Sequence, residues 1–170
     1  MPVSDKFHYL PKSSEVSKVT DNASERLQLY KKHLKNGISG LIEQFKKGTS
    51  ISQLLKARSA FVDNILKASW NQFQIDTKCC LVAIGGYGRQ ELQPFSDVDI
   101  LILIEKTSAT ENLESWIAFL WDIGLEVGHS VRTLNDCHEL SQDDISIATS
   151  LMESRHLTGN AALYKSLING

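Results

Sequence analysis

The sequence is poor in the residue that stabilises small folds covalently, because only three of its 170 residues are cysteine. Three cysteines with no metal-ligand spacing form neither a disulfide framework nor a zinc site. This excludes disulfide-stapled secreted domains and small zinc-binding modules. Two of the three, Cys79 and Cys80, lie in an apolar run and are interpreted as small buried hydrophobic residues in a reducing compartment.

Excess charge and long apolar runs are also missing. The formal net charge is −2, so the chain has no general attraction to nucleic acid or to acidic membranes. No apolar run approaches the roughly 20 residues of a membrane span, and the N-terminal segment lacks the apolar core of a secretory signal. We therefore expect a soluble, cytoplasmic protein with no membrane partner and no nucleic-acid partner.

Two familiar nucleotide-binding motifs are absent as well. The Walker pattern, GxxxxGK followed by serine or threonine, occurs nowhere in the sequence. The glycines Gly86 and Gly88 begin a pattern like the dinucleotide fingerprint, but Glu91 stands where that fingerprint requires glycine or alanine. The sequence therefore carries neither motif.

The domain organisation is simple. A chain of this length is expected to form one domain, and a hydrophobic content of 42% is enough for a core. Residues 1–22 are polar and include two prolines, so we predict a flexible N-terminal arm there. Residues 23–170 are predicted to form the folded domain.

Apolar residues at helical spacing predict a helical N-terminal part. The clearest helix begins at Ser50, which with Gln53 forms a capping box, and Arg58 lies near its apolar stripe. Arg58 either packs its aliphatic chain on the core with its guanidinium at the edge of the core, or contacts a nucleotide. Both interpretations stay open. The expected helices span residues 24–36, 38–47 and 50–73.

A second capping box, Ser108 with Glu111, predicts a helix that ends at Gly124. Trp116 and Trp121 lie on its apolar stripe and are interpreted as core residues rather than base-stacking platforms. Residues 143–169 are expected to be helical in two pieces, interrupted near Gly159. Strands are expected over residues 79–84, 98–104 and 125–132, which gives an α+β fold with a small mixed sheet and packed helices.

Two aspartates, Asp97 and Asp99, stand at the head of the second apolar run. Side chains alternate along a strand, so the two carboxylates share a face, with their backbones about 7 Å apart. Leu101 continues that face, and residues 98, 100, 102 and 104 fill the other. A strand apolar on both faces is buried, and paired carboxylates at its tip are oxygen ligands suited to Mg²⁺ or Mn²⁺.

These residues, together with the glycines before them, resemble a known signature. The string GGYGRQELQPFSDVDILIL is similar to the G-G/S…D-x-D signature of the polymerase-β-type nucleotidyltransferase superfamily. It resembles most closely the N-terminal nucleotidyltransferase domain of the PII-protein uridylyltransferase/uridylyl-removing enzymes. The resemblance extends from about Tyr30 to the C-terminus, and includes the segments LLKARSAFVDNIL, LEVGHSVRT and TSLMESRHLTG.

The resemblance implies a small twisted mixed sheet with helices on one side. It also implies a third carboxylate from a neighbouring strand to help hold the first metal ion, for which Glu126 is favoured over Glu105 and Asp122. The bare backbone of Gly85 and Gly86 would let N–H groups approach a triphosphate. By the same resemblance, UTP is the donor and a tyrosine hydroxyl of the PII nitrogen-regulatory protein is the acceptor.

Two further residues beside the proposed phosphate site keep two interpretations each. Arg89 contacts a phosphate or forms a structural ion pair with Glu91. Ser96 donates to a phosphate or caps the turn before the acidic pair.

The enzymes resembled also carry a later HD-type metal domain, which removes the uridylyl group, and C-terminal ACT domains that sense glutamine. This chain has no His-Asp dipeptide. We therefore expect a truncated chain without removal activity and without glutamine regulation. Two alternatives stay open: transfer to another protein or small-molecule acceptor, and an inactive fragment that binds nucleotide.

Overall fold

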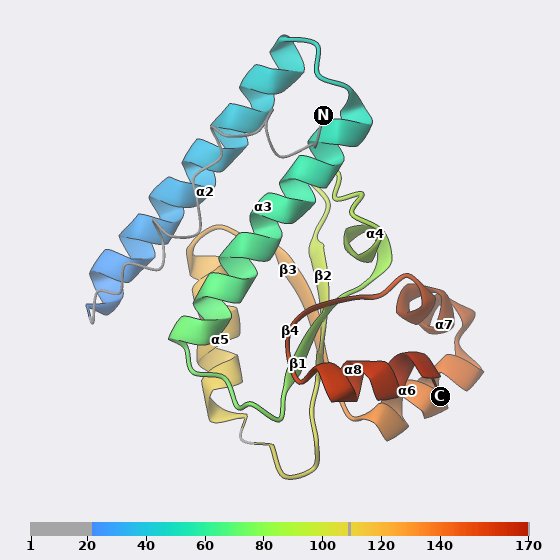
Figure 1. Ribbon diagram of the computed structural model, residues 1–170. Coiled ribbons are helices and arrows are strands. Elements are labelled where there is room, and N and C mark those ends of the chain that lie inside the picture. Colours follow the sequence, from blue (N-terminus) through green and yellow to red (C-terminus); the bar gives the residue numbers. More distant parts are fainter. Residues whose placement is uncertain (1–21, 109, 170) are drawn as a thin grey trace.

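The computed structural model describes residues 22–108 and 110–169, which form an α+β fold as predicted (Figure 1). The predicted arm, residues 1–22, lies outside the described residues except for Asn22, which caps the first helix. The helices are α2 (Ala23–Lys46), α3 (Ile51–Gln72), α4 (Gly85–Gly88), α5 (Glu111–Asp122), α6 (Leu134–Asp143), α7 (Ile145–Met152) and α8 (Ala161–Asn169). The strands are β1 (Cys80–Ala83), β2 (Val98–Leu103), β3 (Val127–Arg132) and β4 (Arg155–Gly159).

The four strands form one mixed sheet in the order β3-β2-β1-β4. Strand β1 pairs antiparallel with both β2 and β4, whereas β2 and β3 run parallel. The crossover between the parallel strands is made by α5, as is usual for parallel neighbours. The predicted mixed sheet is therefore confirmed, and the structure supplies the strand order that the sequence left undetermined.

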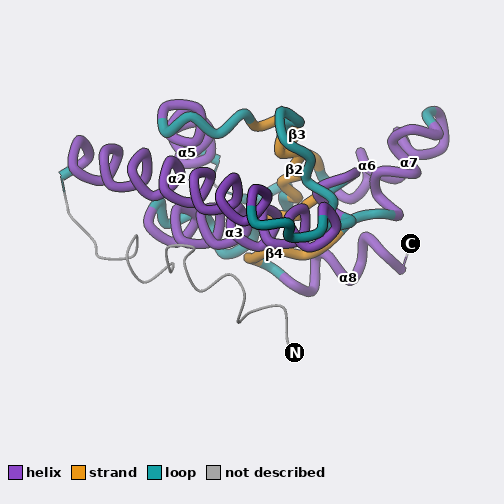
Figure 2. Tube along the Cα trace, turned by 90° about the horizontal axis from the view of Figure 1, so that it is seen from above, coloured by secondary structure: helices purple, strands orange, loops and turns teal. Residues whose placement is uncertain are grey.

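Strand β2 separates two hydrophobic cores. Val98, Ile100 and Ile102 point into the larger core with α2, α3 and α5, whereas Leu101 and Leu103 point into a smaller core with α6 and α8. This is the alternation predicted from the sequence. Helices therefore cover both faces of the sheet, as Figure 1 and Figure 2 show, whereas the resemblance implied helices on one side.

The N-terminal part differs from the prediction of two short helices. Residues Ala23–Lys46 form one continuous helix that packs side by side with α3 (Figure 1). Gly37, predicted to separate the helices, lies against Phe61, and a Cβ at position 37 would be 2.1 Å from Cζ of that ring. The glycine serves close helix packing, which local sequence reading mistook for a stop signal.

One predicted helix cap is found and another is not. The hydroxyl of Ser50 accepts the N–H of Gln53 at the start of α3. The hydroxyl of Ser108 instead accepts the N–H of Glu105, and α5 begins at Glu111 without a side-chain cap. The predicted second capping box is therefore wrong, although the helix ends before Gly124 as expected.

The C-terminal part contains a strand that the sequence pattern did not reveal. Strand β4 lies where the two helical pieces were expected to be interrupted, and α6 begins earlier, at Leu134. The segment RHLTG has little apolar alternation and becomes a strand by pairing with the edge of β1. Gly159 allows this pairing, since a Cβ there would lie 2.3 Å from the carbonyl oxygen of Cys79.

The cysteines of the described residues are buried thiols, and the helices are too short or too polar to cross a membrane. All three cysteines are buried and free, and burial was predicted for Cys79 and Cys80. Burial raises the pKa of the Cys80 thiol to about 12, which makes this thiol unreactive. Among the described residues, no helix is long and apolar enough to cross a membrane.

Candidate functional site

The structure brings the acidic pair and the glycine turn together at one end of the sheet. Asp97 immediately precedes β2 and Asp99 is its second residue, and both side chains are exposed. The N–H of Ile84 donates to the carbonyl oxygen of Asp99 at 3.1 Å, which aligns the end of β1 with the acidic pair. The position of a Cβ on Gly85 is 4.0 Å from Oδ2 of Asp99.

The two carboxylates interact electrostatically. Partial burial raises the pKa of Asp99, and the negative charge of Asp97 raises it further. Among the described residues, no cationic side chain lowers the pKa of Asp99. Two like charges of this kind are the donor set that a hard divalent cation prefers. The two carboxylates therefore fit a Mg²⁺ or Mn²⁺ ion at Asp97 and Asp99.

The absence of a side chain at Gly128 leaves room for the Asp99 carboxylate. Gly128 pairs with Asp99 on the neighbouring parallel strand. A Cβ at Gly128 would lie 2.6 Å from Oδ1 of Asp99, which is closer than real Cβ contacts. Sequence reasoning missed this residue, because strand register between β2 and β3 is needed to see it.

Glu126, the favoured third carboxylate, lies beside Asp97. Its carbonyl oxygen accepts the N–H of Val98 at 2.9 Å, and both acidic residues line an open hollow of about 470 Å³. Within residues 22–108 and 110–169, however, no three His, Cys, Asp or Glu side chains form a group that could hold a metal ion. Glu126 is thus adjacent to the pair without completing a three-carboxylate cluster.

One of the two tryptophans predicted in the core borders this hollow. Trp116 is fully buried, as expected, but Trp121 is 55% exposed and lines the hollow with Asp97 and Glu126. The indole N–H of Trp121 donates to the carbonyl oxygen of Val127, and its ring packs against His129. The core interpretation is therefore wrong for Trp121.

The glycine turn forms the single-turn helix α4. Gly85 has a φ of +57°, a left-handed conformation that favours glycine. The N–H groups of Gly88 and Arg89 donate to the carbonyl oxygens of Ile84 and Gly85, closing the turn. Because N–H groups in the first turn of a helix have no partner within it, the bare backbone at Gly85 and Gly86 suits an anion.

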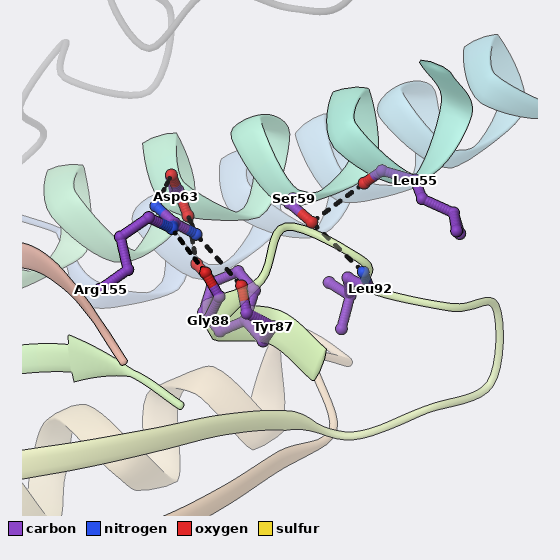
Figure 3. A network of polar contacts seen from close by, with 7 residues as sticks. All are labelled: Leu55, Ser59, Asp63, Tyr87, Gly88, Leu92 and Arg155. Carbon is purple, nitrogen blue, oxygen red and sulfur yellow. Dashed lines mark hydrogen bonds and ion pairs between the residues drawn. The ribbon is translucent and has the colours of Figure 1, made fainter. Parts of the chain in front are cut away.

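A buried polar network fixes α4 in place (Figure 3). The hydroxyl of Tyr87 donates to Oδ1 of Asp63 on α3 at 2.6 Å, and the Arg155 guanidinium donates to both carboxylate oxygens of Asp63. Arg155 also donates to the carbonyl oxygens of Tyr87 and Gly88. Burial raises the pKa of Tyr87 well above its usual range, and the charge of Asp63 raises it further, so the hydroxyl stays protonated and donates.

A second set of contacts ties α3 to the loop after α4. The Ser59 hydroxyl accepts the N–H of Leu92 at 3.3 Å and donates to the carbonyl oxygen of Leu55 at 2.9 Å (Figure 3). The neighbouring Arg58 donates to the carbonyl oxygen of Gln93. This agrees with the rim interpretation of Arg58 and makes α3 the support of the whole glycine loop.

Sequence reasoning missed Asp63, Tyr87 and Arg155 as positioning residues. One signal was available, because the acidic Asp63 stands between Val62 and Ile65, two apolar residues of the helix stripe. A buried acid requires a partner, but the sequence did not show that the partner is Arg155, 92 positions further along the chain.

Arg89 and Ser96 both make contacts within the chain. The Arg89 guanidinium pairs with Glu91 at 2.9 Å and with Glu153, which confirms the structural ion pair. Its Nη2 atom nevertheless lies 3.8 Å from the position of a Cβ on Gly86, beside the glycine turn. The Ser96 hydroxyl donates to the carbonyl oxygen of Gln93 at 2.8 Å, so it caps the turn.

A smaller hollow of about 150 Å³ continues along the sheet face that carries Asp99. Its floor includes Leu101, two residues beyond Asp99, and its polar lining consists of Ser130, Arg132, Ser146 and Ser150. Hydroxyl groups and a guanidinium around an apolar floor suit the sugar or phosphate of a nucleotide. This hollow thus lies between the sheet face that carries Asp99 and α7.

Comparison with known proteins identifies relatives of this chain. No family model matches the sequence. The chain is 48% identical over 130 residues, 74% of its length, to a bifunctional uridylyltransferase/uridylyl-removing enzyme of Hydrogenovibrio crunogenus. Enzymes with the same name from Pseudomonas savastanoi and Nitrosococcus oceani are each 44% identical, over 76% and 89% of this chain. The chain spans only 15% to 18% of the length of these relatives.

Proposed function

Because this chain is related by sequence to bifunctional uridylyltransferase/uridylyl-removing enzymes, we propose that it transfers a uridylyl group from UTP to a tyrosine of the PII nitrogen-regulatory protein. The observation that carries the proposal is the position of Gly85 directly beside the Asp99 carboxylate. A bare backbone for phosphate and a carboxylate pair for a metal ion are then parts of one site. The predicted cytoplasmic location stays a prediction.

The acidic pair would hold Mg²⁺ or Mn²⁺, and Glu126, just before β3, would become a further ligand by turning its exposed side chain toward the ion. When bound, such an ion would lower the pKa of the acceptor hydroxyl and neutralise charge on the leaving pyrophosphate. Gly128 supports this role, because it leaves the Asp99 carboxylate free to face the ligand. The raised pKa of Asp99 supports it too, since a cation would relieve the repulsion from Asp97.

In the proposed reaction the tyrosine oxygen bonds to the α-phosphorus of UTP. The bond from this phosphorus to the bridging oxygen of pyrophosphate breaks, and the phenolic proton passes to solvent. Gly85 and Gly86 would bind the phosphates through backbone N–H groups, and Arg89 would add a charge-assisted contact from the donors that its ion pairs leave over. Ser96 would fix the turn that places Asp97. The protein contributes position and electrostatics, and no covalent nucleophile of its own is needed.

The direct test is transfer of label from α-³²P-UTP to purified PII in the presence of Mg²⁺ or Mn²⁺. The wild-type chain is expected to label PII, and the double variant Asp97→Asn/Asp99→Asn is expected to lose this activity. Asp143→Asn, which changes an exposed carboxylate on α6, is the matched control and should behave as wild type. Transfer that survives in the double variant would contradict the assigned site, and no transfer by any chain would contradict the proposed function.

A further inference from the structure

Phe95 is the most exposed large hydrophobic residue of the described part of the chain. Its side chain is 99% exposed and lies two residues before Asp97, on the loop that joins α4 to β2. Isolated exposed hydrophobic residues are common, but an aromatic ring that is almost completely in water beside a candidate active site is unusual. Within residues 22–108 and 110–169, the ring therefore packs against almost nothing that would explain its position.

The backbone at this position is also unfavourable for phenylalanine. The N–H of Ser96 donates to the carbonyl oxygen of Gln93 at 3.2 Å, which closes a four-residue turn with Pro94 and Phe95 in the middle. Phe95 has a φ of +66°. Proline followed by a residue of positive φ is the pattern of a type II turn, whose third position normally holds glycine or asparagine. A phenylalanine there strains the backbone and gains nothing from burial.

The turn is nevertheless held firmly in this conformation. The carbonyl oxygen of Gln93 accepts hydrogen bonds from the Ser96 hydroxyl and from the Arg58 guanidinium, in addition to the turn bond itself. Arg58 extends from α3, the same helix that supports the glycine turn through Asp63 and Ser59. The turn that carries the exposed Phe95 ring is therefore tied to α3, the helix that also supports the glycine turn.

We propose that Phe95 is the anchor through which the protein acceptor docks, by inserting its ring into an apolar cavity of the acceptor next to the reacting hydroxyl. This inference rests on the proposed function. A nucleobase stacked on Phe95 would cover one face of the ring and leave the rest in water. A macromolecular partner encloses the whole ring, as aromatic anchors are enclosed at protein interfaces. Because the anchor is two residues from Asp97, docking there brings the acceptor hydroxyl to the acidic pair.

The variant Phe95→Gly tests this inference, because glycine suits the positive φ and removes only the ring. Three quantities are measured: the KM for purified PII in the uridylyl transfer assay, the Kd for Mg-UTP without PII, and the Tm. We expect the KM for PII to rise at least tenfold, the Kd for Mg-UTP to stay the same, and the Tm to stay the same or rise. Phe45→Ala, which removes an exposed ring from the C-terminal turn of α2, is the matched control and should change neither constant.

An unchanged KM for PII in an active Phe95→Gly enzyme would overturn the inference while leaving the proposed function intact. A Kd for Mg-UTP that rises in step with KM would show that the ring stacks on the nucleobase and would also overturn it. A lowered Tm would show a structural role, with the same consequence. If the wild-type chain transfers nothing to PII, the proposed function itself fails and this inference fails with it.

Discussion

Gly128 lies directly beside Asp99 on the neighbouring parallel strand. Because Gly128 has no side chain, the Asp99 carboxylate can occupy the space beside it. A Cβ at position 128 would be 2.6 Å from Oδ1 of Asp99. The geometry of the candidate metal ligand thus depends on a residue that carries no functional group.

Gly128→Ala is expected to displace the Asp99 carboxylate and to reduce uridylyl transfer about 100-fold, the order of magnitude for a displacement of about 1 Å in a catalytic group. The fold should persist, because the strand keeps its pairing and Asp99 can rotate away. Steady-state transfer kinetics and circular dichroism measure the two effects. Val131→Ala, at an exposed position on the other face of the same strand, is the control and should retain most activity. Full activity in Gly128→Ala would show that the carboxylate position is unimportant.

Asp99→Asn is expected to stabilise the metal-free protein at pH 7. The pKa of Asp99 is raised in the fold above the value of about 3.9 in the unfolded chain, so its ionisation disfavours the folded state. This penalty is absent below the unfolded pKa and develops as the pH rises through the folded pKa. The Tm difference between variant and wild type in EDTA should therefore be positive at pH 7 and disappear near pH 3.

If the acidic pair binds Mg²⁺, adding the ion should make the Tm of the wild type higher than that of Asp99→Asn. The wild-type Tm should rise with Mg²⁺ concentration, whereas Asp99→Asn should respond little, because ligand binding stabilises only the state that binds. Thermal denaturation at constant ionic strength, with Na⁺ as the control cation, measures the effect. Equal shifts in both proteins would argue against a metal site at Asp99.

Asp63→Asn is expected to lower the free energy of unfolding by about 3 kcal/mol, the lower end of the range for breaking a buried ion pair. Arg155 would lose its carboxylate partner, and one of the two oxygens that accept from Arg155 and Tyr87 would be replaced by a donor. Tyr87→Phe removes one hydrogen bond to a charged group and should cost about 1.5 kcal/mol. Urea denaturation measures both, with the exposed Asp122→Asn as control. A loss below about 1 kcal/mol in Asp63→Asn would contradict the supporting role of the network.

Gly37→Ala is expected to destabilise the fold by about 1–3 kcal/mol, as overpacking of a close contact does. In an isolated helix the same change would be stabilising by about 1 kcal/mol. The sign of the effect therefore shows whether close packing against Phe61 or helix propensity decides the stability at position 37. The new methyl group would overlap the Phe61 ring, which is 2% exposed and has little room to move. The double variant Gly37→Ala/Phe61→Leu should recover part of the loss.

Local patterns in the sequence predicted a large share of the structure. The two faces of β2, the helix that starts at Ser50 and the glycine turn before the acidic pair were all found as expected. Each of these depends on residues within a few positions of one another. The wrong predictions concern Gly37, Trp121 and β4. They have a common origin, because the surroundings of each are formed by segments distant in the sequence.

The amino-acid sequence by itself determined which segments alternate, which turn needs glycine and where two carboxylates follow each other, because these properties arise from neighbouring residues. Only the tertiary structure decided that Gly128 lies beside Asp99, that Arg155 pairs with Asp63, and that β4 completes the sheet. Such contacts join segments far apart in the chain, and they exist because packing the whole domain places those segments together.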